Sequence, residues 1–365
     1  MTALQFISRA FTALVAMTFL SGCMKDSFPG QDSPDVLPEA GSGLFILCEG
    51  NYNAGNSSLT FYDTEEMKAY DNVFSGANDG QKLGDTGQSM TMHGGSLWAV
   101  VNASHVVFAI DPLTFREKGR IVSSDMTSPR FIHFVSDSKA YVSQLYDNRI
   151  LIADPGTFRV TGSIDTGMEQ GTASVEQMVQ YGDYVLANCW SYQKSIIKID
   201  SRTDEIVQKL EVGLQPQSIC LDSENRLWVL TDGGAWPENP AGYEAPRLVC
   251  VDPDAFTVEK TFYFALGDSP SELQAGPDGN ELYFLNNGKV WKMPVSADSL
   301  PDSPFIDPGD GTWPYAMTVC PWNSDVYVAD AIDYVQNGAV TRYSADGKAV
   351  DEFRTGVCPG SFCWF

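Results

Sequence analysis

Residues 128–154 read SPRFIHFVSDSKAYVSQLYDNRILIAD, and much of the chain repeats their pattern. The stretch opens on a Ser-Pro step, continues through the aromatic and β-branched residues 140–142, and closes with the apolar run 150–153 before Asp154. Short runs of this kind, separated by Asp, Asn and Ser, predict antiparallel strands joined by tight turns. We therefore expect this segment to form one small antiparallel sheet.

The pattern recurs at intervals of roughly 40 to 50 residues, the spacing that is typical of propeller blades. Each unit has a first strand led by Pro or a polar residue, a second strand rich in aromatic and β-branched residues, a variable loop, and an apolar strand that ends near Asp. Units after the first begin at Gln88, Ser128, Glu176, Gln215, Ser269 and Trp313. The repeat indicates an all-β fold and a single domain.

The two ends of the repeat region complete each other. The C-terminal segment 359–365 matches a first strand with no unit after it, whereas the first unit begins directly at residues 44–47 without a first strand. Pairing these halves would close a ring and remove an exposed strand edge. We therefore predict a seven-bladed β-propeller over residues 44–365, closed by a C-terminal strand that completes the first blade. An open solenoid is the alternative, but it would carry atypical polar caps at both ends.

Charge excludes one class of partner. The chain of 365 residues has 23 Lys and Arg against 47 Asp and Glu, a formal charge of −24. It contains no basic tract that could gather phosphates, so we expect no nucleic-acid partner. The acidity is typical of a protein that stays dispersed when exposed to solvent.

The N-terminal sequence is typical of a bacterial lipoprotein. Arg9 precedes the apolar run 10–20, which is too short to span a bilayer but suits a signal peptide. Leu20-Ser21-Gly22-Cys23 follows and looks like a lipobox. We predict a signal peptide over residues 1–22, lipidation of Cys23, and a flexible tether over residues 23–43. An ordinary signal peptide with a chance cysteine is the alternative.

Cysteines and histidines offer little for catalysis. Seven cysteines follow Cys23. We interpret four of them, Cys220, Cys250, Cys320 and Cys363, as core residues. A disulfide between Cys358 and Cys363 is unfavourable, because residues five apart in an extended strand lie far from each other. The histidines are His93, His105 and His133. We interpret them as turn or strand-end residues, and His105 alone of the three lies in a loop on the expected binding face. No nucleophile elbow, P-loop, dinucleotide fingerprint or zinc motif occurs, so we expect neither an enzyme nor a metal site.

Aspartates recur where the apolar strands end. They are Asp63, Asp111, Asp154, Asp200 and Asp252, each followed by Pro, Ser or Thr. A calcium site is one interpretation of such a series. We favour side-chain capping of the tight turn inside each blade.

Loops after the second strand of each unit should open onto one face of the ring, where variation leaves the blades intact. In this chain those loops are rich in aromatic and amide residues. The candidate ligand-binding residues are Asn51, Tyr52, Gln144, Tyr146, Asn188, Trp190, Tyr192, Trp236, Tyr243, Asp333 and Tyr334. Such a surface suits a large, partly apolar ligand with many hydrogen-bonding groups, or a mixed protein surface. For any one aromatic, Trp190 and Tyr146 above all, packing of a loop against its blade is the alternative.

Several runs carry a resemblance to a known family: residues 44–52, 88–91, 128–141, 176–190, 227–234, 267–273 and 326–336. They resemble the YncE-like propeller lipoproteins of Bacteroidetes, and within these the BtuG group, which captures cobalamin for a TonB-dependent vitamin B12 transporter. The resemblance covers nearly all of the chain after the tether. Lys25-Asp26 is also similar to the export signal of surface lipoproteins in these bacteria.

The resemblance implies a binding protein without enzymatic activity, anchored by lipid to the outer membrane and exposed at the cell surface. Its ligand would be cobalamin or a related corrinoid, and its partner a TonB-dependent transporter of the B12 type. His105, in a loop on the expected binding face, is then the one histidine that we consider as a ligand of the cobalt. A face toward the periplasm remains the alternative location. Two other functions stay open: an interaction platform for another protein or a surface glycan, and an enzyme of the lactonase or lyase kind.

Overall fold

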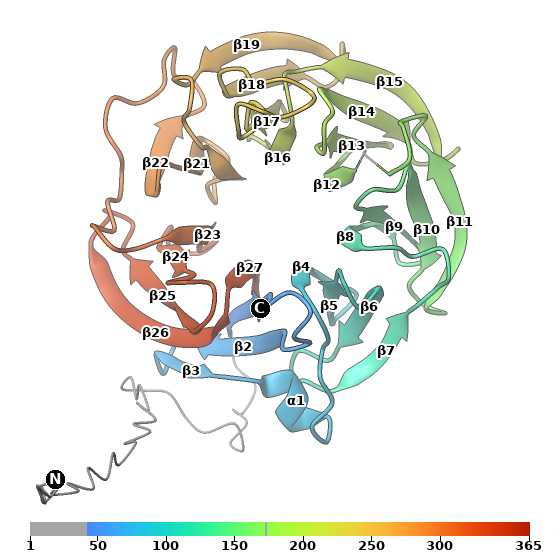
Figure 1. Ribbon diagram of the computed structural model, residues 1–365, viewed down its shortest axis with the longest axis vertical. Coiled ribbons are helices and arrows are strands. Elements are labelled where there is room, and N and C mark those ends of the chain that lie inside the picture. The colour runs from blue at the N-terminus through green and yellow to red at the C-terminus, as the bar shows by residue number, and fades with distance from the viewer. Residues whose placement is uncertain (1–41, 172–173) are drawn as a thin grey trace, which may run out of the picture.

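The computed structural model describes residues 42–171 and 174–365. In it, seven antiparallel sheets stand around a central axis like the blades of a propeller (Figure 1). The expected signal peptide, the lipidation of Cys23 and the tether up to residue 41 lie outside the described residues. The first strand begins at Gly43, one residue before the predicted start of the propeller.

Within each sheet the strands are ordered from the ring centre outward. Blade 1 contains β27 (Pro359–Trp364), β1 (Gly43–Cys48), β2 (Ser58–Asp63) and β3 (Lys68–Tyr70), followed by the short helix α1 (Val73–Ala77). Blade 2 contains β4 (Gly87–His93), β5 (Ser96–Val101), β6 (Val106–Ile110) and β7 (Glu117–Ile121). Blade 3 contains β8 (Pro129–Ser136), β9 (Lys139–Gln144), β10 (Arg149–Asp154) and β11 (Arg159–Asp165). Blade 4 contains β12 (Val175–Tyr181), β13 (Tyr184–Cys189), β14 (Ser195–Asp200) and β15 (Glu205–Glu211).

The last three blades continue the ring. Blade 5 contains β16 (Pro216–Leu221), β17 (Leu227–Thr231), β18 (Arg247–Asp252) and β19 (Thr257–Tyr263). Blade 6 contains β20 (Ser271–Ala275), β21 (Glu281–Asn286) and β22 (Lys289–Pro294). Blade 7 contains β23 (Pro314–Val319), β24 (Val326–Asp330), β25 (Asn337–Tyr343) and β26 (Ala349–Val357). The predicted seven-bladed propeller is confirmed.

Ring closure occurs through β27, as the sequence predicts. This strand pairs with β1 in antiparallel register, with Leu44 opposite Trp364 and Ile46 opposite Phe362. Backbone hydrogen bonds of 3.0 and 2.9 Å between Gly43 and Phe365 extend the pairing to the last residue. The C-terminal strand therefore removes the open edge that β1 would otherwise present.

Blade 6 has three strands where the repeat predicts four. After Pro294 the chain crosses the outer edge of the sheet and touches it through one bridge, between Val290 and Ile306. Prolines at positions 301, 304 and 308 fall in this crossing. Each lacks the N–H that a strand would donate to β22, so this segment is a poor fourth strand.

The core lies between neighbouring blades. Val100 of β5 and Val142 of β9, both fully buried, belong to one apolar cluster that joins blades 2 and 3. The seven described cysteines are free; Cys250 and Cys320 are buried, and the half-buried Cys220 and Cys363 pack against apolar clusters. Their interpretation as core residues is confirmed.

The recurring aspartates cap turns, as the sequence indicates. Asp63, Asp111, Asp154, Asp200 and Asp252 each accept a hydrogen bond from the backbone N–H two residues further on. Among residues 42–171 and 174–365, no helix has the length and apolar character that a bilayer span requires.

Candidate functional site

All seven inner strands carry a β-bulge close to their first residue. In β4 the register shifts between Gly87 and Ser89, in β16 between Pro216 and Ser218, and in β23 between Pro314 and Ala316. Equivalent shifts occur in the other four inner strands. A bulge leaves one residue outside the ladder and redirects its side chain, and bulges are common at barrel rims beside functional sites. The bulges therefore form a ring of redirected side chains at one end of the central axis.

These side chains surround a cavity of about 580 Å³. We call this end of the axis the first mouth. Its lining includes Gln88, Arg130, Gln217, Glu272, Tyr315 and Gly360, which come from the bulged starts of six inner strands, together with Glu49 and Trp190 from second-strand loops. The size suits a small molecule or one part of a larger ligand.

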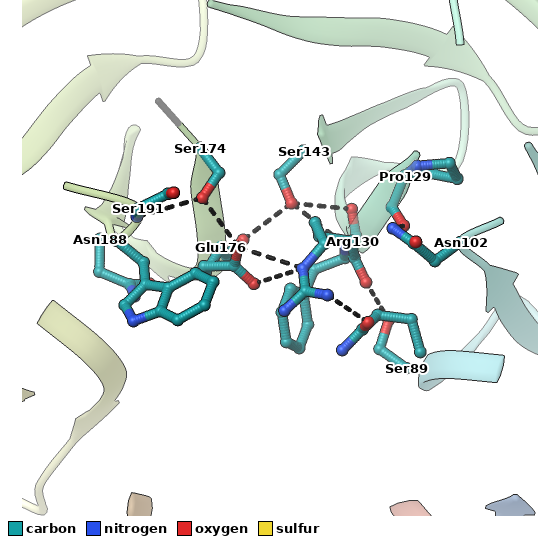
Figure 2. A network of polar contacts seen from close by, with 12 residues as sticks. Ser89, Asn102, Pro129, Arg130, Ser143, Ser174, Glu176, Asn188 and Ser191 are labelled. Carbon is teal, nitrogen blue, oxygen red and sulfur yellow. Dashed lines mark hydrogen bonds and ion pairs between the residues drawn. The ribbon is translucent and has the colours of Figure 1, made fainter. Parts of the chain in front are cut away.

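Among the residues that the structure describes, Arg130 is the one basic residue that lines the first mouth, and its neighbours hold it in place (Figure 2). Its Nε donates to both carboxylate oxygens of Glu176, at 2.8 and 3.1 Å, and its Nη1 donates to Gln88 Oε1. The hydroxyl of Ser174 donates to Glu176 Oε1 at 3.0 Å. Because these partners lie in blades 2 and 4, Arg130 of blade 3 is fixed from both sides. Its Nη2 takes part in neither contact and is left for other partners.

Trp190 stands beside Arg130, and an acid holds its ring. Its Nε1 donates to Asp232 Oδ2 at 2.8 Å, and Asp232 also accepts from the Gln215 side chain and the Gly234 backbone. The guanidinium carbon of Arg130 lies 5.9 Å from the centre of the indole ring. Trp190 therefore presents a preoriented aromatic face at the first mouth.

Three carboxylates on the wall of the first mouth are stabilised in their neutral forms. Burial raises the pKa of Glu272 to about 7, and Glu49 adds to the shift. Burial also raises the pKa of Glu49, which accepts a 2.9 Å hydrogen bond from the Tyr315 hydroxyl, and the pKa of Asp232. The charge of this wall therefore changes as the pH approaches neutrality.

Six of the predicted site residues lie on the surrounding loops, and Trp190 alone among the predicted set lines the cavity itself. Tyr52 is 76% exposed, Tyr146 50%, Trp236 41% and Tyr334 48%. Tyr192 and Tyr243 are half-buried. These six aromatics, which we call the rim, follow the second strands of blades 1, 3, 4, 5 and 7.

The other four predicted residues hold loops. Gln144 is 1% exposed and accepts from the Thr127 backbone, and Asn188 is fully buried and donates to the Pro216 carbonyl. Asn51 donates to the Tyr334 carbonyl at 2.6 Å. Asp333 accepts from the backbone N–H groups of residues 335 and 336. Gln144 and Asn188 are buried and do not line the cavity, and their role in ligand binding stays a prediction.

The residues that sequence reasoning missed are Gln88, Arg130, Gln217, Glu272 and Tyr315. The signal was present, because a Pro or Gly with a polar residue beside it opens most of the first strands: Gly87-Gln88, Pro129-Arg130, Pro216-Gln217 and Pro314-Tyr315. From sequence we interpret these residue pairs only as the starts of blades, not as residues of a binding site. The bulge that turns their side chains depends on pairing register, which the repeat does not reveal.

The histidines lie apart from the first mouth. His105 is exposed, but its Nδ1 accepts the Ser128 backbone N–H at 2.9 Å, so that nitrogen is engaged in holding a loop. His93 ends β4, as expected of a strand-end residue, whereas His133 lies inside β8. Within the described part of the chain, no group of three or more His, Cys, Asp or Glu side chains could hold a metal ion.

Comparison with known proteins places the chain in a family. Residues 42–355 match the profile described as Domain of unknown function (DUF5074). The chain belongs to this family. No curated protein matches the DUF5074 chain.

Solved structures share the fold of this DUF5074 propeller at low identity. A quinonprotein alcohol dehydrogenase-like protein from Bacteroides thetaiotaomicron is 16% identical, with a TM-score of 0.66 over 88% of this chain and 78% of that one. A candidate 6-phosphogluconolactonase from Bacteroides fragilis is 13% identical, with a TM-score of 0.66 over 89% of this chain and 98% of that one. A protein from Lactobacillus plantarum is 11% identical, with a TM-score of 0.66 over 89% and 99%. At these identities the likeness shows the propeller fold and no activity.

Proposed function

We propose that this DUF5074 propeller is a binding protein without enzymatic activity that captures cobalamin or a related corrinoid at the first mouth. The observation that supports the proposal most is the combination, at one end of the ring, of preoriented hydrogen-bonding side chains and an exposed aromatic rim. A corrinoid combines the same two features, since its broad apolar macrocycle carries a border of amides. The sequence resemblance to cobalamin-binding propellers supports the same ligand.

Hydrogen-bonding groups of the first mouth are available to a ligand. The Gln217 Oε1 atom is buried without a hydrogen-bond partner among the described residues. A buried polar atom in that state is costly, and a ligand donor would satisfy it once the half-buried Gln217 side chain turned its oxygen toward the cavity. The Arg130 Nη2 group offers donors for an amide oxygen or a phosphate. β-Bulges place both residues at the first mouth, and Glu176 and Gln88 hold the Arg130 guanidinium, so a ligand would not have to order that group.

The rim would carry most of the ligand. A corrinoid is larger than a cavity of about 580 Å³, so only one edge of it would enter the first mouth. The rest would lie against Tyr52, Tyr146, Trp236 and Tyr334, all of which are exposed. Exposed large apolar side chains gathered on one face are typical of interaction sites.

Binding fits the first mouth better than catalysis does. The residues that line it include no histidine or cysteine, and Arg130 is already paired with Glu176. A carboxylate such as Glu272 could act as a general acid or base, but no activated nucleophile lies among the lining residues. The lactonase and dehydrogenase-like proteins of similar fold therefore do not lead us to propose either activity.

We further propose that the protein is anchored through Cys23 to the outer membrane and delivers its ligand to a TonB-dependent transporter. This rests on the lipobox-like sequence and on the family resemblance. Metabolic labelling with a palmitate analogue should mark the wild-type chain and not Cys23→Ala. Co-purification from outer membranes should recover a TonB-dependent barrel; recovery of a polysaccharide-utilisation complex would instead support an interaction platform.

Isothermal titration with cyanocobalamin tests the ligand. We expect saturable binding at one site per chain, and Gln217→Ala should weaken it at least about tenfold, the effect of losing one buried hydrogen bond. The matched control is Gln208→Ala on outer strand β15, which should bind like wild type. The absence of binding heat at micromolar cyanocobalamin would refute the corrinoid assignment. Equal affinity of the two variants for cyanocobalamin would refute the assignment of the first mouth as the binding site.

A further inference from the structure

A second cavity lies at the opposite end of the same inner strands. It has a volume of about 550 Å³ and is lined by the later residues of β4, β8, β12 and β16, of which β4, β8 and β16 also line the first mouth. In β8, for example, Arg130 faces the first mouth, whereas residues 131–134 line the second cavity. We call this end of the axis the second mouth.

The two mouths differ in chemistry. Carboxylates and Arg130 line the first, whereas no Asp, Glu, Lys or Arg within the described part of the chain lines the second. Apolar side chains dominate it, and several of them, such as Met92, Phe131 and Leu221, stay half-buried facing the cavity. One carboxylate outside the lining, that of the exposed Asp137, contacts His93 Nε2 at 3.1 Å. Placing an ion in the rest of the cavity would be costly, because none of the described residues that line it carries Asp, Glu, Lys or Arg chemistry.

One aromatic wall of the second mouth is rigid. The His93 ring stacks on Phe134 with centroids 4.1 Å apart and planes 5° apart. Trp98 packs behind Phe134 at 5.1 Å and donates from its Nε1 to the His93 carbonyl at 3.2 Å. A flat ring system entering the cavity would therefore meet a preformed stacking surface.

His133 supplies a hydrogen-bond acceptor with a fixed tautomer. Its Nε2 lies 3.0 Å from Gln180 Oε1, while the Gln180 amide nitrogen donates to the carbonyls of Gly182 and Tyr184. The amide oxygen must therefore accept, so the proton of His133 is on Nε2. Burial lowers the pKa of His133, which keeps the ring neutral. Its Nδ1 is consequently a lone-pair acceptor.

We propose that the second mouth is a binding site for an uncharged compound of two or three rings that carries one hydrogen-bond donor. The cavity volume lies in the range of small-molecule sites. A lining without charged side chains disfavours ions, the His93–Phe134 wall favours flat rings, and the Nδ1 acceptor of His133, a lining residue, favours a ligand with a donor. This site is separate from the corrinoid site proposed for the first mouth and does not depend on it.

N-phenyl-1-naphthylamine is a suitable probe, because it is uncharged, has three aromatic rings and one N–H donor, and fluoresces in apolar surroundings. We expect a saturable fluorescence increase at one probe per chain. Thr91→Glu, which places a carboxylate in the lining, should lower the probe affinity at least about tenfold. The matched control is Thr257→Glu on the exposed side of β19, which should leave the affinity unchanged.

His133→Phe keeps an aromatic ring and removes the acceptor, so it should lower the affinity several-fold. Melting curves of each variant check folding, and Thr91→Glu decides the question if His133→Phe is unfolded. Fluorescence that does not saturate, or equal affinity of Thr91→Glu and Thr257→Glu, would overturn the proposal. Displacement of the probe by cyanocobalamin in equilibrium dialysis would also overturn it, since two separate sites would not compete.

Discussion

Trp364→Ala measures what ring closure contributes to stability. Trp364 lies on β27 opposite Leu44, contacts Tyr327 and Trp322 edge-on at 5.2 and 5.4 Å, and donates to Thr318 at 3.2 Å. Two aromatic contacts at about 1 kcal/mol each and one hydrogen bond at about 1 kcal/mol give a loss of about 3 kcal/mol. That value lies at the lower end of the range for buried Trp→Ala changes, as suits a half-buried ring.

Urea unfolding followed by tryptophan fluorescence is the assay. With a denaturant slope of about 3 kcal/mol/M, the unfolding midpoint should fall by about 1 M. The control is Trp322→Ala, which removes a tryptophan that neighbours Trp364. Trp322 is a suitable control because it is 64% exposed and its one aromatic contact among the described residues is with Trp364. Its midpoint should fall by only about 0.3 M, because it loses the one contact with Trp364 at about 1 kcal/mol. Equal shifts for the two variants would refute the closure argument.

Two further predictions concern the first mouth. Arg130→Met leaves the Glu176 carboxylate, whose side chain is 4% exposed, without its cation, so the free energy of unfolding should drop by about 3 kcal/mol in urea titrations. The double variant Arg130→Met/Glu176→Leu should recover most of the loss; a double variant as unstable as the sum of the single changes would contradict this. Burial raises the pKa of Glu272 from 4.5 to about 7 in the folded chain, so the folded state holds this proton more tightly and the protein loses stability as the pH rises through that interval. Glu272→Gln should therefore melt higher than wild type above pH 7 and at the same temperature below about pH 4.5; melting curves that differ equally at every pH would rule out this origin.

The blades could be predicted from sequence because each one repeats local chemistry. The aspartates that end the apolar strands, such as Asp111 and Asp154, cap turns by accepting a hydrogen bond from the backbone N–H only two residues further along the chain. The pairing of segment 359–365 could also be predicted from sequence. This segment resembles the first strand of a blade but has no second strand after it, so in a closed ring it can pair only with the first blade, which lacks a first strand. Loss of the fourth strand in blade 6 was less evident, since it depends on three prolines in a segment that interrupts the repeat.

The site was predicted less well, for a physical reason. Gln144 and Asn188 have the amide chemistry of ligand-binding residues, but both lie at ends of second strands, where they satisfy backbone groups of loops and of the next blade. Burial decides between these roles, and burial depends on how the blades pack. Arg130 and Gln217 become site residues through bulges, which depend on register between strands rather than on residue type.

Cobalt offers the most direct test of the central claim, that the first mouth binds a corrinoid. Crystals of the protein with cyanocobalamin, measured at the cobalt absorption edge, would locate the metal by its anomalous signal. Binding at the first mouth predicts one peak per chain above that mouth, within the rim and beside its four exposed residues, Tyr52, Tyr146, Trp236 and Tyr334. A peak on any other face of the ring, or none at saturating cyanocobalamin, would contradict it.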